Sequence, residues 1–206
     1  MVHAPQQARA VATRARLIDA ARSLLAEEGM RGTTTAAVAA RAEVSQGALF
    51  KHFPTKLELL AASAEAVLRS LVDEFPAGLP DRPPSDLDGR MRAGVAALWR
   101  VFRLPAMQGV FEVYLAARTD PDLARALAPL LTAHRENILA EARALLPELA
   151  SEPGLASAVD AVVYAMQGVA LGVFSSDEHR EREHLAFFER LAARELREAL
   201  AAKRRG

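Results

Sequence analysis

The sequence contains no cysteine, so disulfide bonds, thiolate metal sites and thiol redox chemistry are all excluded. Long apolar runs are missing as well. The most apolar stretch, residues 161–174, is interrupted by Gln167 and is shorter than the roughly 20 residues that span a bilayer. The first residues form no apolar signal segment. We therefore expect a soluble, cytoplasmic protein with no membrane partner.

Motifs that support catalysis are absent too. The sequence has no His-Glu-x-x-His zinc motif, no nucleophile elbow and no glycine-rich phosphate loop. His179 and His184 lie in a charged segment, but a spacing of five residues does not align them on one helix face. A solvated loop fits this pair better than a metal site. The sequence thus predicts no enzyme activity, no metal and no cofactor.

A helical pattern dominates what is present. With 206 residues, 51% of them hydrophobic, the chain can form a packed core in one large or two modest domains. Apolar residues recur at spacings of three and four, and no sustained alternation of apolar and polar residues appears. This pattern predicts an all-α protein.

The whole chain contains equal numbers of basic and acidic residues, but they are unevenly distributed along it. Residues 1–56 contain eight lysines and arginines against four acidic residues, whereas the remainder carries an acidic excess. A basic end is typical of a surface that holds nucleic-acid phosphates. Chance produces differences of this size as well, so the asymmetry supports DNA binding only together with a motif.

Residues 33–56 provide such a motif, because they predict two short helices joined by a tight turn. Thr34 and Ser45 are the expected N-caps, since a hydroxyl oxygen accepts a hydrogen bond from a backbone N–H that the helix leaves free. Together the two helices form a helix-turn-helix. The inward-facing apolar residues are Val38, Ala39 and Ala42 on the first helix and Leu49 and Phe53 on the second.

This stretch, TTTAAVAARAEVSQGALFKHFPTK, resembles the N-terminal signature of the tetracycline-repressor (TetR) family of bacterial transcriptional regulators. Three positions depart from the signature: Val38 replaces isoleucine, Glu43 replaces the glycine of the turn, and Phe50 replaces tyrosine. Glycine at the turn tolerates positive φ, so Glu43 is expected to introduce strain of about 1 kcal/mol. Phe50 lacks the hydroxyl that the family's tyrosine donates to phosphate.

The resemblance implies which side chains contact DNA. Gln46 and Ala48 are implied to meet base edges in the major groove, and Gly47 lets the backbone come close. His52 and Lys56 are implied to hold phosphates. A purely structural role as caps is the alternative for Thr34 and Ser45. The full predicted DNA-binding set is Thr34, Ser45, Gln46, Gly47, Ala48, Phe50, Lys51, His52 and Lys56.

About nine helices are expected in all. A first helix over residues 9–28, stopped by Gly29, is the platform for the helix-turn-helix. Thr55 and Glu58 predict a capping box that starts a helix of about 20 residues, which rises roughly 30 Å. The resemblance implies a DNA-binding head over residues 1–55 and a helical ligand-binding and dimerisation domain over residues 56–206.

Two sets of residues are assigned to that second domain. Large side chains on its helices either line a cavity for a small, largely apolar effector or form an ordinary core. Two apolar helices near the C-terminus can form a four-helix bundle with a second copy. The predicted effector set is Trp99, Phe102, Met107, Phe111, Tyr114, Tyr164 and Met166. The predicted dimer set is Val159, Val162, Val163, Val173, Leu185, Phe188, Leu191 and Leu196.

The sequence therefore predicts a ligand-responsive, homodimeric transcriptional repressor that binds double-stranded DNA at a pseudo-palindromic operator. The alternative is an all-α small-molecule-binding or enzymatic protein that keeps the head but lacks specific operator binding, as Glu43 and Phe50 would allow. Activation in place of repression is a further variant, which depends on where the operator lies.

Overall fold

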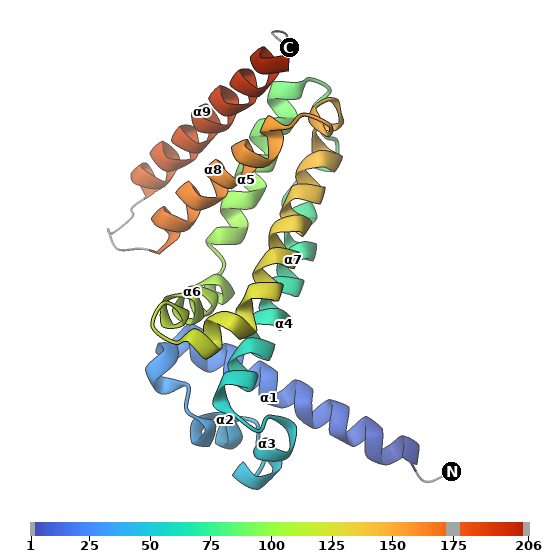
Figure 1. Cartoon of the computed structure of the whole chain (residues 1–206), viewed down its shortest axis with the longest axis vertical. Helices are drawn as coiled ribbons and strands as arrows, with labels where there is room; N and C mark the ends of the chain where they lie inside the picture. The colour runs from blue at the N-terminus through green and yellow to red at the C-terminus, as the bar shows by residue number, and fades with distance from the viewer. Residues whose placement is uncertain (1–2, 172–177, 204–206) are drawn as a thin grey trace. The chain divides into compact units, whose positions relative to one another are not determined.

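A computed structural model describes residues 3–171 and 178–203 of the chain. Over these residues the protein is helical and contains no strand, so the all-α prediction is confirmed. The helices are drawn in Figure 1. They are α1 (His3–Gly32), α2 (Thr35–Arg41), α3 (Gln46–His52), α4 (Lys56–Ala77), α5 (Leu87–Phe102), α6 (Pro105–Ala117), α7 (Pro121–Leu145), the 3₁₀-helix η1 (Pro147–Leu149), α8 (Gly154–Ala170) and α9 (Glu178–Lys203).

Helix α1 is interrupted at Gly29, as predicted. The backbone there has φ 65° and ψ −168°, a conformation that residues with a Cβ rarely adopt. Thr33, only 1% exposed, closes the turn that follows, because both its backbone N–H and its hydroxyl donate to the Gly29 carbonyl oxygen at 3.2 and 2.8 Å. This turn leads directly into Thr34, the N-cap of α2.

The helix-turn-helix forms through the predicted caps. The Thr34 hydroxyl oxygen accepts from the Ala37 N–H, and the Ser45 hydroxyl oxygen accepts from the Ala48 N–H, each at 3.1 Å. Between the helices Glu43 has φ 53°, in the left-handed region. The turn is a Schellman motif, since the Glu43 N–H donates to the Ala40 carbonyl and the Val44 N–H to the Ala39 carbonyl. Glu43 thus occupies the position that glycine usually takes.

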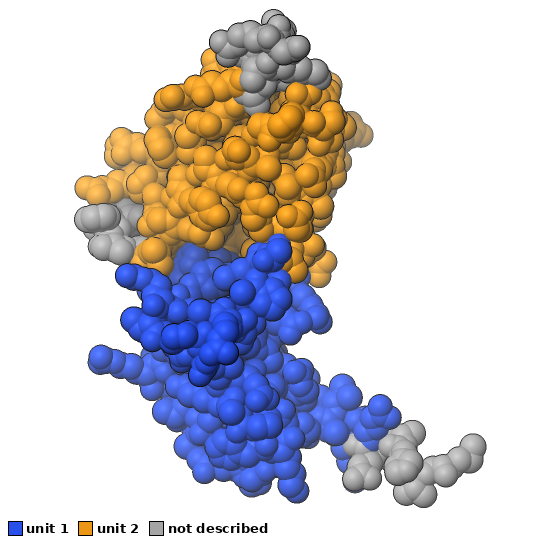
Figure 2. All heavy atoms as spheres, viewed as in Figure 1, with its two compact units in different colours: residues 1–70, 105–132 blue, residues 71–104, 133–206 orange. Residues whose placement is uncertain are grey.

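The chain divides into two compact units, coloured separately in Figure 2. Unit 1 comprises residues 1–70 and 105–132, and unit 2 comprises residues 71–104 and 133–206. Unit 1 holds the whole predicted head, α6 and the first parts of α4 and α7. The predicted boundary after residue 55 stays a prediction.

Unit 1 is built around two buried clusters. The first joins α1 to the helix-turn-helix and contains Leu17, Leu24, Leu49 and Phe53, all 2% exposed or less. The second packs α4, α6 and α7 against the end of α1 and centres on Val113. Contact between α1 and α6 is close, because a Cβ at Gly109 would lie 3.0 Å from the Cβ of Leu25. Helix α6 is therefore fixed to the platform on which the helix-turn-helix packs.

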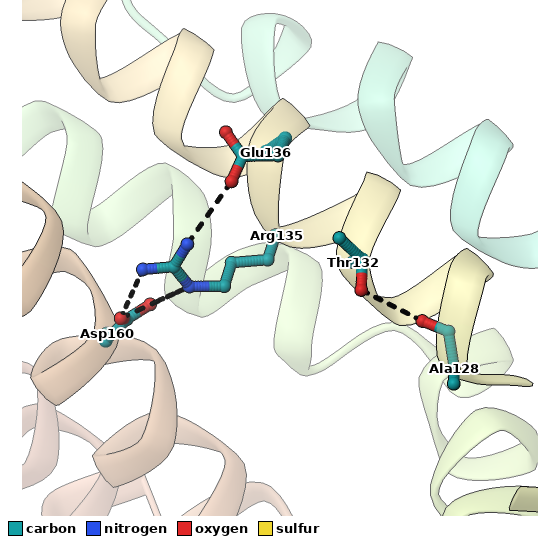
Figure 3. A network of polar contacts seen from close by, with 5 residues as sticks. All are labelled: Ala128, Thr132, Arg135, Glu136 and Asp160. Atoms are coloured by element: carbon teal, nitrogen blue, oxygen red, sulfur yellow. Dashed lines mark hydrogen bonds and ion pairs between the residues drawn. The ribbon is translucent and has the colours of Figure 1, made fainter.

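Unit 2 packs α5, α8 and α9 together (Figure 1). Trp99 of α5 lies against Phe188 of α9, with ring centroids 5.1 Å apart, and both side chains are buried. Arg135 of α7 holds α8 through a two-pronged ion pair: its Nε and Nη2 atoms lie 2.9 and 2.7 Å from the two Asp160 carboxylate oxygens (Figure 3). This hydrogen bonding raises the pKa of the Arg135 guanidinium.

Two prolines lie within helices instead of ending them. Helix α4 continues through Pro76 to Ala77, and α7 contains Pro129. Asp86 caps α5, as its carboxylate accepts from the Gly89 N–H at 2.7 Å. This bond lowers the pKa of Asp86. None of the helices, over the residues that the structure describes, is both long and apolar enough to cross a membrane.

Candidate functional site

The outer face of α3 is the candidate nucleic-acid interface. Leu49 is fully buried and fixes the inner face of this helix, which turns the remaining side chains outward. Gln46, Gly47 and Lys51 are exposed, and Ala48 is half-buried. The structure therefore brings the predicted base-contacting residues together at the start of one exposed helix.

Gly47 has no structural reason to lack a side chain. A Cβ at this position would meet only the Ser45 hydroxyl, at 4.0 Å, and Gly47 has an ordinary helical backbone. Glycine in a helix is unfavourable by roughly 0.5–1 kcal/mol relative to alanine. A residue that weakens the helix and fills no tight space fits a surface on which another molecule comes close to the backbone.

The two cap hydroxyls remain available to a partner. Thr34 and Ser45 are exposed, and their oxygens accept from the backbone, so each O–H hydrogen is free to be donated. The structural role predicted as the alternative is confirmed. It is compatible with a phosphate contact, because capping uses the acceptor function of the hydroxyl and phosphate uses its donor function.

Phe50 and His52 lie towards the end of α3. The Phe50 ring is 45% exposed, which is unusual for a large apolar side chain, and His52 is half-buried. Next to them Arg14 of α1 places its guanidinium carbon 4.9 Å from the centre of the Phe53 ring. This cation–π contact brings a positive charge to the end of α3. The predicted set missed Arg14 because the contact joins residues 39 positions apart.

Lys56, a predicted phosphate contact, also binds the protein backbone. Its ammonium donates to the Met30 carbonyl oxygen at 3.4 Å, and its side chain is half-buried. An ammonium has three hydrogens, so this contact leaves donors for a phosphate. Arg41, by contrast, is engaged by Glu27 at 2.7 Å and Glu28 at 3.7 Å, which reduces its value as a phosphate contact.

The predicted effector residues divide between the two units. In unit 1, Met107 and Phe111 are buried, and Tyr114 is half-buried with its ring centroid 6.4 Å from that of Phe111. Burial raises the pKa of Tyr114. Helices α1, α4 and α6 enclose a small cavity beside Arg22, Ser63 and Gly109. Its volume of about 10 Å³ corresponds to roughly one water molecule. None of the three predicted effector residues contributes to its lining.

In unit 2 three of the four predicted effector residues are buried, and one is not. Trp99, Phe102 and Met166 are 8% exposed or less, whereas Tyr164 is 63% exposed. Met166 belongs to the interior face of α8, and Tyr164 belongs to its outer face. The effector assignment stays a prediction, with Tyr164 better placed for contact with a partner than for a cavity in its own chain.

His134 of α7 is a polar residue of unit 2 with one ring nitrogen that lacks a visible partner. Its Nδ1 atom is buried without a hydrogen bond in the part of α7 that the structure describes. Burial lowers the pKa of His134, so the neutral imidazole is favoured. A buried ring nitrogen of this kind is suited to a hydrogen bond with a polar group of a ligand.

The predicted dimer residues differ in how far the chain itself buries them. Val162, Val163, Phe188 and Leu196 are buried by packing within the chain itself, which explains them without a partner. The residues Val159, Leu185 and Leu191 are half-buried. Val173 lies outside the described residues.

A different set on the same two helices is exposed and apolar. Tyr164 lies within α8 and is 63% exposed, Leu171 follows the last residue of α8 and is 38% exposed, and Phe187 of α9 is 47% exposed. Gly168 lies between the first two, with open space around the position of a Cβ. Periodicity alone missed these residues, since both faces of α8 are apolar and only packing distinguishes the inner face from the outer one.

No group of three metal-binding side chains occurs among the residues whose positions are described. His179 instead pairs with Glu183 on an exposed turn of α9, at 3.4 Å. The side chain of His184 lies at the edge of the Trp99 ring, with ring centroids 6.5 Å apart. Both histidines lie in α9 with separate surroundings, so the solvated loop predicted for this pair is wrong.

Known proteins resemble this chain in sequence and in fold. The family profile described as bacterial regulatory proteins, tetR family, matches residues 17–63. An uncharacterized HTH-type transcriptional regulator of Mycobacterium tuberculosis is 35% identical over 144 residues, 68% of this chain and 71% of that protein. The HTH-type transcriptional regulator BetI of Burkholderia thailandensis is 35% identical over 155 residues, 71% of this chain and 77% of BetI. The crystal structure of the multidrug binding protein EbrR complexed with proflavin is 25% identical, with a TM-score of 0.60 over 87% of this chain and 99% of that one.

Proposed function

Since the chain belongs to the tetR family of bacterial regulatory proteins, we propose that it is a repressor that binds a pseudo-palindromic operator as a homodimer and leaves it when an effector binds. That it is a DNA-binding transcriptional regulator follows from the family and its relatives, which are named as regulators and not as enzymes. The observation that carries the proposal is the exposed start of α3, where Gly47 leaves the backbone open beside Gln46 and Ala48.

In this proposal α3 enters the major groove with its N-terminal end towards the bases. Gln46 and Ala48 read base edges, the first by hydrogen bonds and the second by its methyl group against thymine. Thr34, Ser45, His52 and Lys56 hold phosphates and set the register. A homodimer would place two such helices in successive grooves, about 34–36 Å apart on the DNA.

The exposed apolar residues of α8 and α9 support the dimer. Tyr164 and Phe187 expose large side chains, and the open space at Gly168 allows a second helix to approach closely. Large exposed apolar side chains on two adjoining helices are typical of a protein–protein contact. We therefore assign the dimer contact to this outer face of α8 and to Phe187, rather than to the buried valines of α8.

The effector is proposed to be a small, largely apolar molecule. Apolar and aromatic side chains dominate the interior of unit 2, and the similar protein EbrR was solved with proflavin bound. Helix α4 is covalently continuous from unit 1 into unit 2, so a change at one end can reach Lys56 at the other. An effector releases DNA only if it binds more tightly to the form with the wrong spacing of recognition helices. Because it acts on chromosomal DNA, the protein is proposed to work in the cytoplasm.

Selection of binding sites from a random oligonucleotide pool tests the proposal. A repressor of this kind enriches one pseudo-palindrome, protects it in a footprint and shows a different base preference when Gln46 is replaced by alanine. Failure to enrich any sequence would support the rival function instead, an all-α small-molecule-binding protein that keeps the head without specific operator binding. Glu43 and Phe50 are the observations that favour this rival.

A further inference from the structure

A carboxylate on α6 contacts the backbone at the end of α1. The Met30 N–H donates to Oε2 of Glu112 at 3.2 Å, a hydrogen bond between residues 82 positions apart. Glu112 follows the buried Phe111 directly in α6 and belongs to unit 1, as does Met30. The contact therefore ties α6 to the residue that follows the interruption of α1.

Gly29 makes room for that carboxylate. A Cβ at Gly29 would lie 3.1 Å from Oε2 and 3.4 Å from the carboxyl carbon of Glu112. The φ of 65° at Gly29 also lies in the left-handed region, where a residue with a side chain is strained. Glycine at this position thus has two causes, the backbone conformation and the space for Glu112.

The same residue, Met30, is held from its other side by α4. Its carbonyl oxygen accepts from the Lys56 ammonium at 3.4 Å, so Met30 lies between a negative and a positive side chain. The Gly29 carbonyl meanwhile accepts two hydrogen bonds from Thr33, immediately before the Thr34 cap of α2. Glu112, Lys56 and Thr33 together fix the segment from which the helix-turn-helix begins.

We propose that Glu112 is a positioning residue through which α6 sets the orientation of the helix-turn-helix for DNA. This inference rests on the proposed function and names a route by which α6 influences the DNA-binding surface. Hydrogen bonds to a charged acceptor are directional, so a shift or rotation of α6 that withdraws the carboxylate frees Met30. Residues 29–33 then lose one of the contacts that hold them in place, and the orientation of α2 and α3 is no longer fixed.

Comparing Glu112→Ala with Glu112→Gln distinguishes a positioning effect of Glu112 on DNA binding from the effect of its negative charge. Loss of a negative charge near a DNA-binding surface should by itself tighten DNA binding, and both variants lose it. Positioning predicts the opposite for alanine, about a fivefold to tenfold weaker Kd for the selected operator. Glutamine should stay close to the wild type, because its amide oxygen still accepts from the Met30 N–H. Glu65→Ala removes a carboxylate from another exposed part of unit 1 and serves as the control.

The experiment begins with the wild-type protein on the selected operator, so failure of the proposed function is seen first and separately. Hydrogen exchange at the Met30 amide should be faster in Glu112→Ala than in Glu112→Gln. Gly29→Ala should weaken binding less in the Glu112→Ala background than in the wild type, since the close contact with Oε2 is gone. The inference is overturned if alanine and glutamine change the operator Kd equally, or if Met30 exchange is the same in both.

Discussion

Replacing Glu43 by glycine should stabilise the protein, because Glu43 is a residue with a side chain in a backbone conformation that favours glycine. Its φ of 53° places it in the left-handed region, at the position of the Schellman motif where glycine is usual. A left-handed conformation costs an L-residue roughly 1–2 kcal/mol. Glycine adds unfolded-state entropy that offsets about 0.4–1 kcal/mol of this gain. The net stabilisation is thus on the order of 0.5–1 kcal/mol.

Thermal or urea unfolding followed by circular dichroism measures this change. For a chain of 150–250 residues a gain of 1 kcal/mol raises Tm by roughly 2–4 °C, so the expected shift is about 1–4 °C. Glu43→Ala is the matched control, since alanine removes the same charge but keeps the unfavourable φ. Equal stabilisation by alanine and glycine would show that the charge, and not the backbone, destabilises the turn, and would refute the reasoning.

DNA binding should respond to the same pair of variants in a different way. Both remove a negative charge from the head, so both should tighten binding at low salt, by a similar factor that shrinks as salt is added. At about 10 Å in water one charge pair is worth about 0.4 kcal/mol, or roughly a twofold change in Kd. Glu43→Gly and Glu43→Ala should therefore differ in protein stability but have similar affinities for DNA.

Three other variants test the remaining assignments. Gly47→Ala should raise helix stability by up to about 1 kcal/mol, because a Cβ at this position meets nothing closer than 4.0 Å. The same variant should weaken operator binding at least roughly tenfold in a gel-shift titration. Tighter binding would contradict the close approach of DNA to the backbone. Phe50→Tyr should tighten operator binding about threefold to tenfold by adding a phosphate hydrogen bond, and an unchanged Kd would mean that this ring faces no phosphate. Tyr164→Glu combined with Phe187→Glu should give a folded monomer in analytical ultracentrifugation at micromolar concentration, and a persisting dimer would exclude the outer α8 surface as the contact.

Helix boundaries could be predicted wherever they depend on local chemistry. The interruption at Gly29 and the caps at Thr34 and Ser45 involve hydrogen bonds within four residues, so the sequence pattern identifies them. The positive φ of Glu43 was equally predictable, because the family signature has glycine there. Pro129 shows the limit, because a proline inside a helix removes a backbone hydrogen bond and favours a helix end, yet α7 continues through it.

The contacts that organise the candidate site could not be predicted, because they join distant parts of the chain. Nothing in the sequence around Glu112 indicates that it accepts from the Met30 N–H, and nothing around Arg14 indicates that its guanidinium lies over the Phe53 ring. Helix α8 poses a different difficulty. Its apolar residues surround the helix, so periodicity cannot tell Val162, covered by its own chain, from Tyr164, which is exposed.

The packing of Trp99 gives the protein a built-in optical reporter. It is the chain's one tryptophan, it belongs to unit 2, and it lies against Phe188, with the edge of His184 and the guanidinium of Arg103 nearby. Indole emission depends on the polarity and charge around the ring, so a molecule that enters unit 2 or repacks α5 against α9 changes the fluorescence of the unmodified protein. Unit 1 contributes no tryptophan signal. Candidate effectors can therefore be screened by intrinsic fluorescence, without a label and without knowledge of the operator.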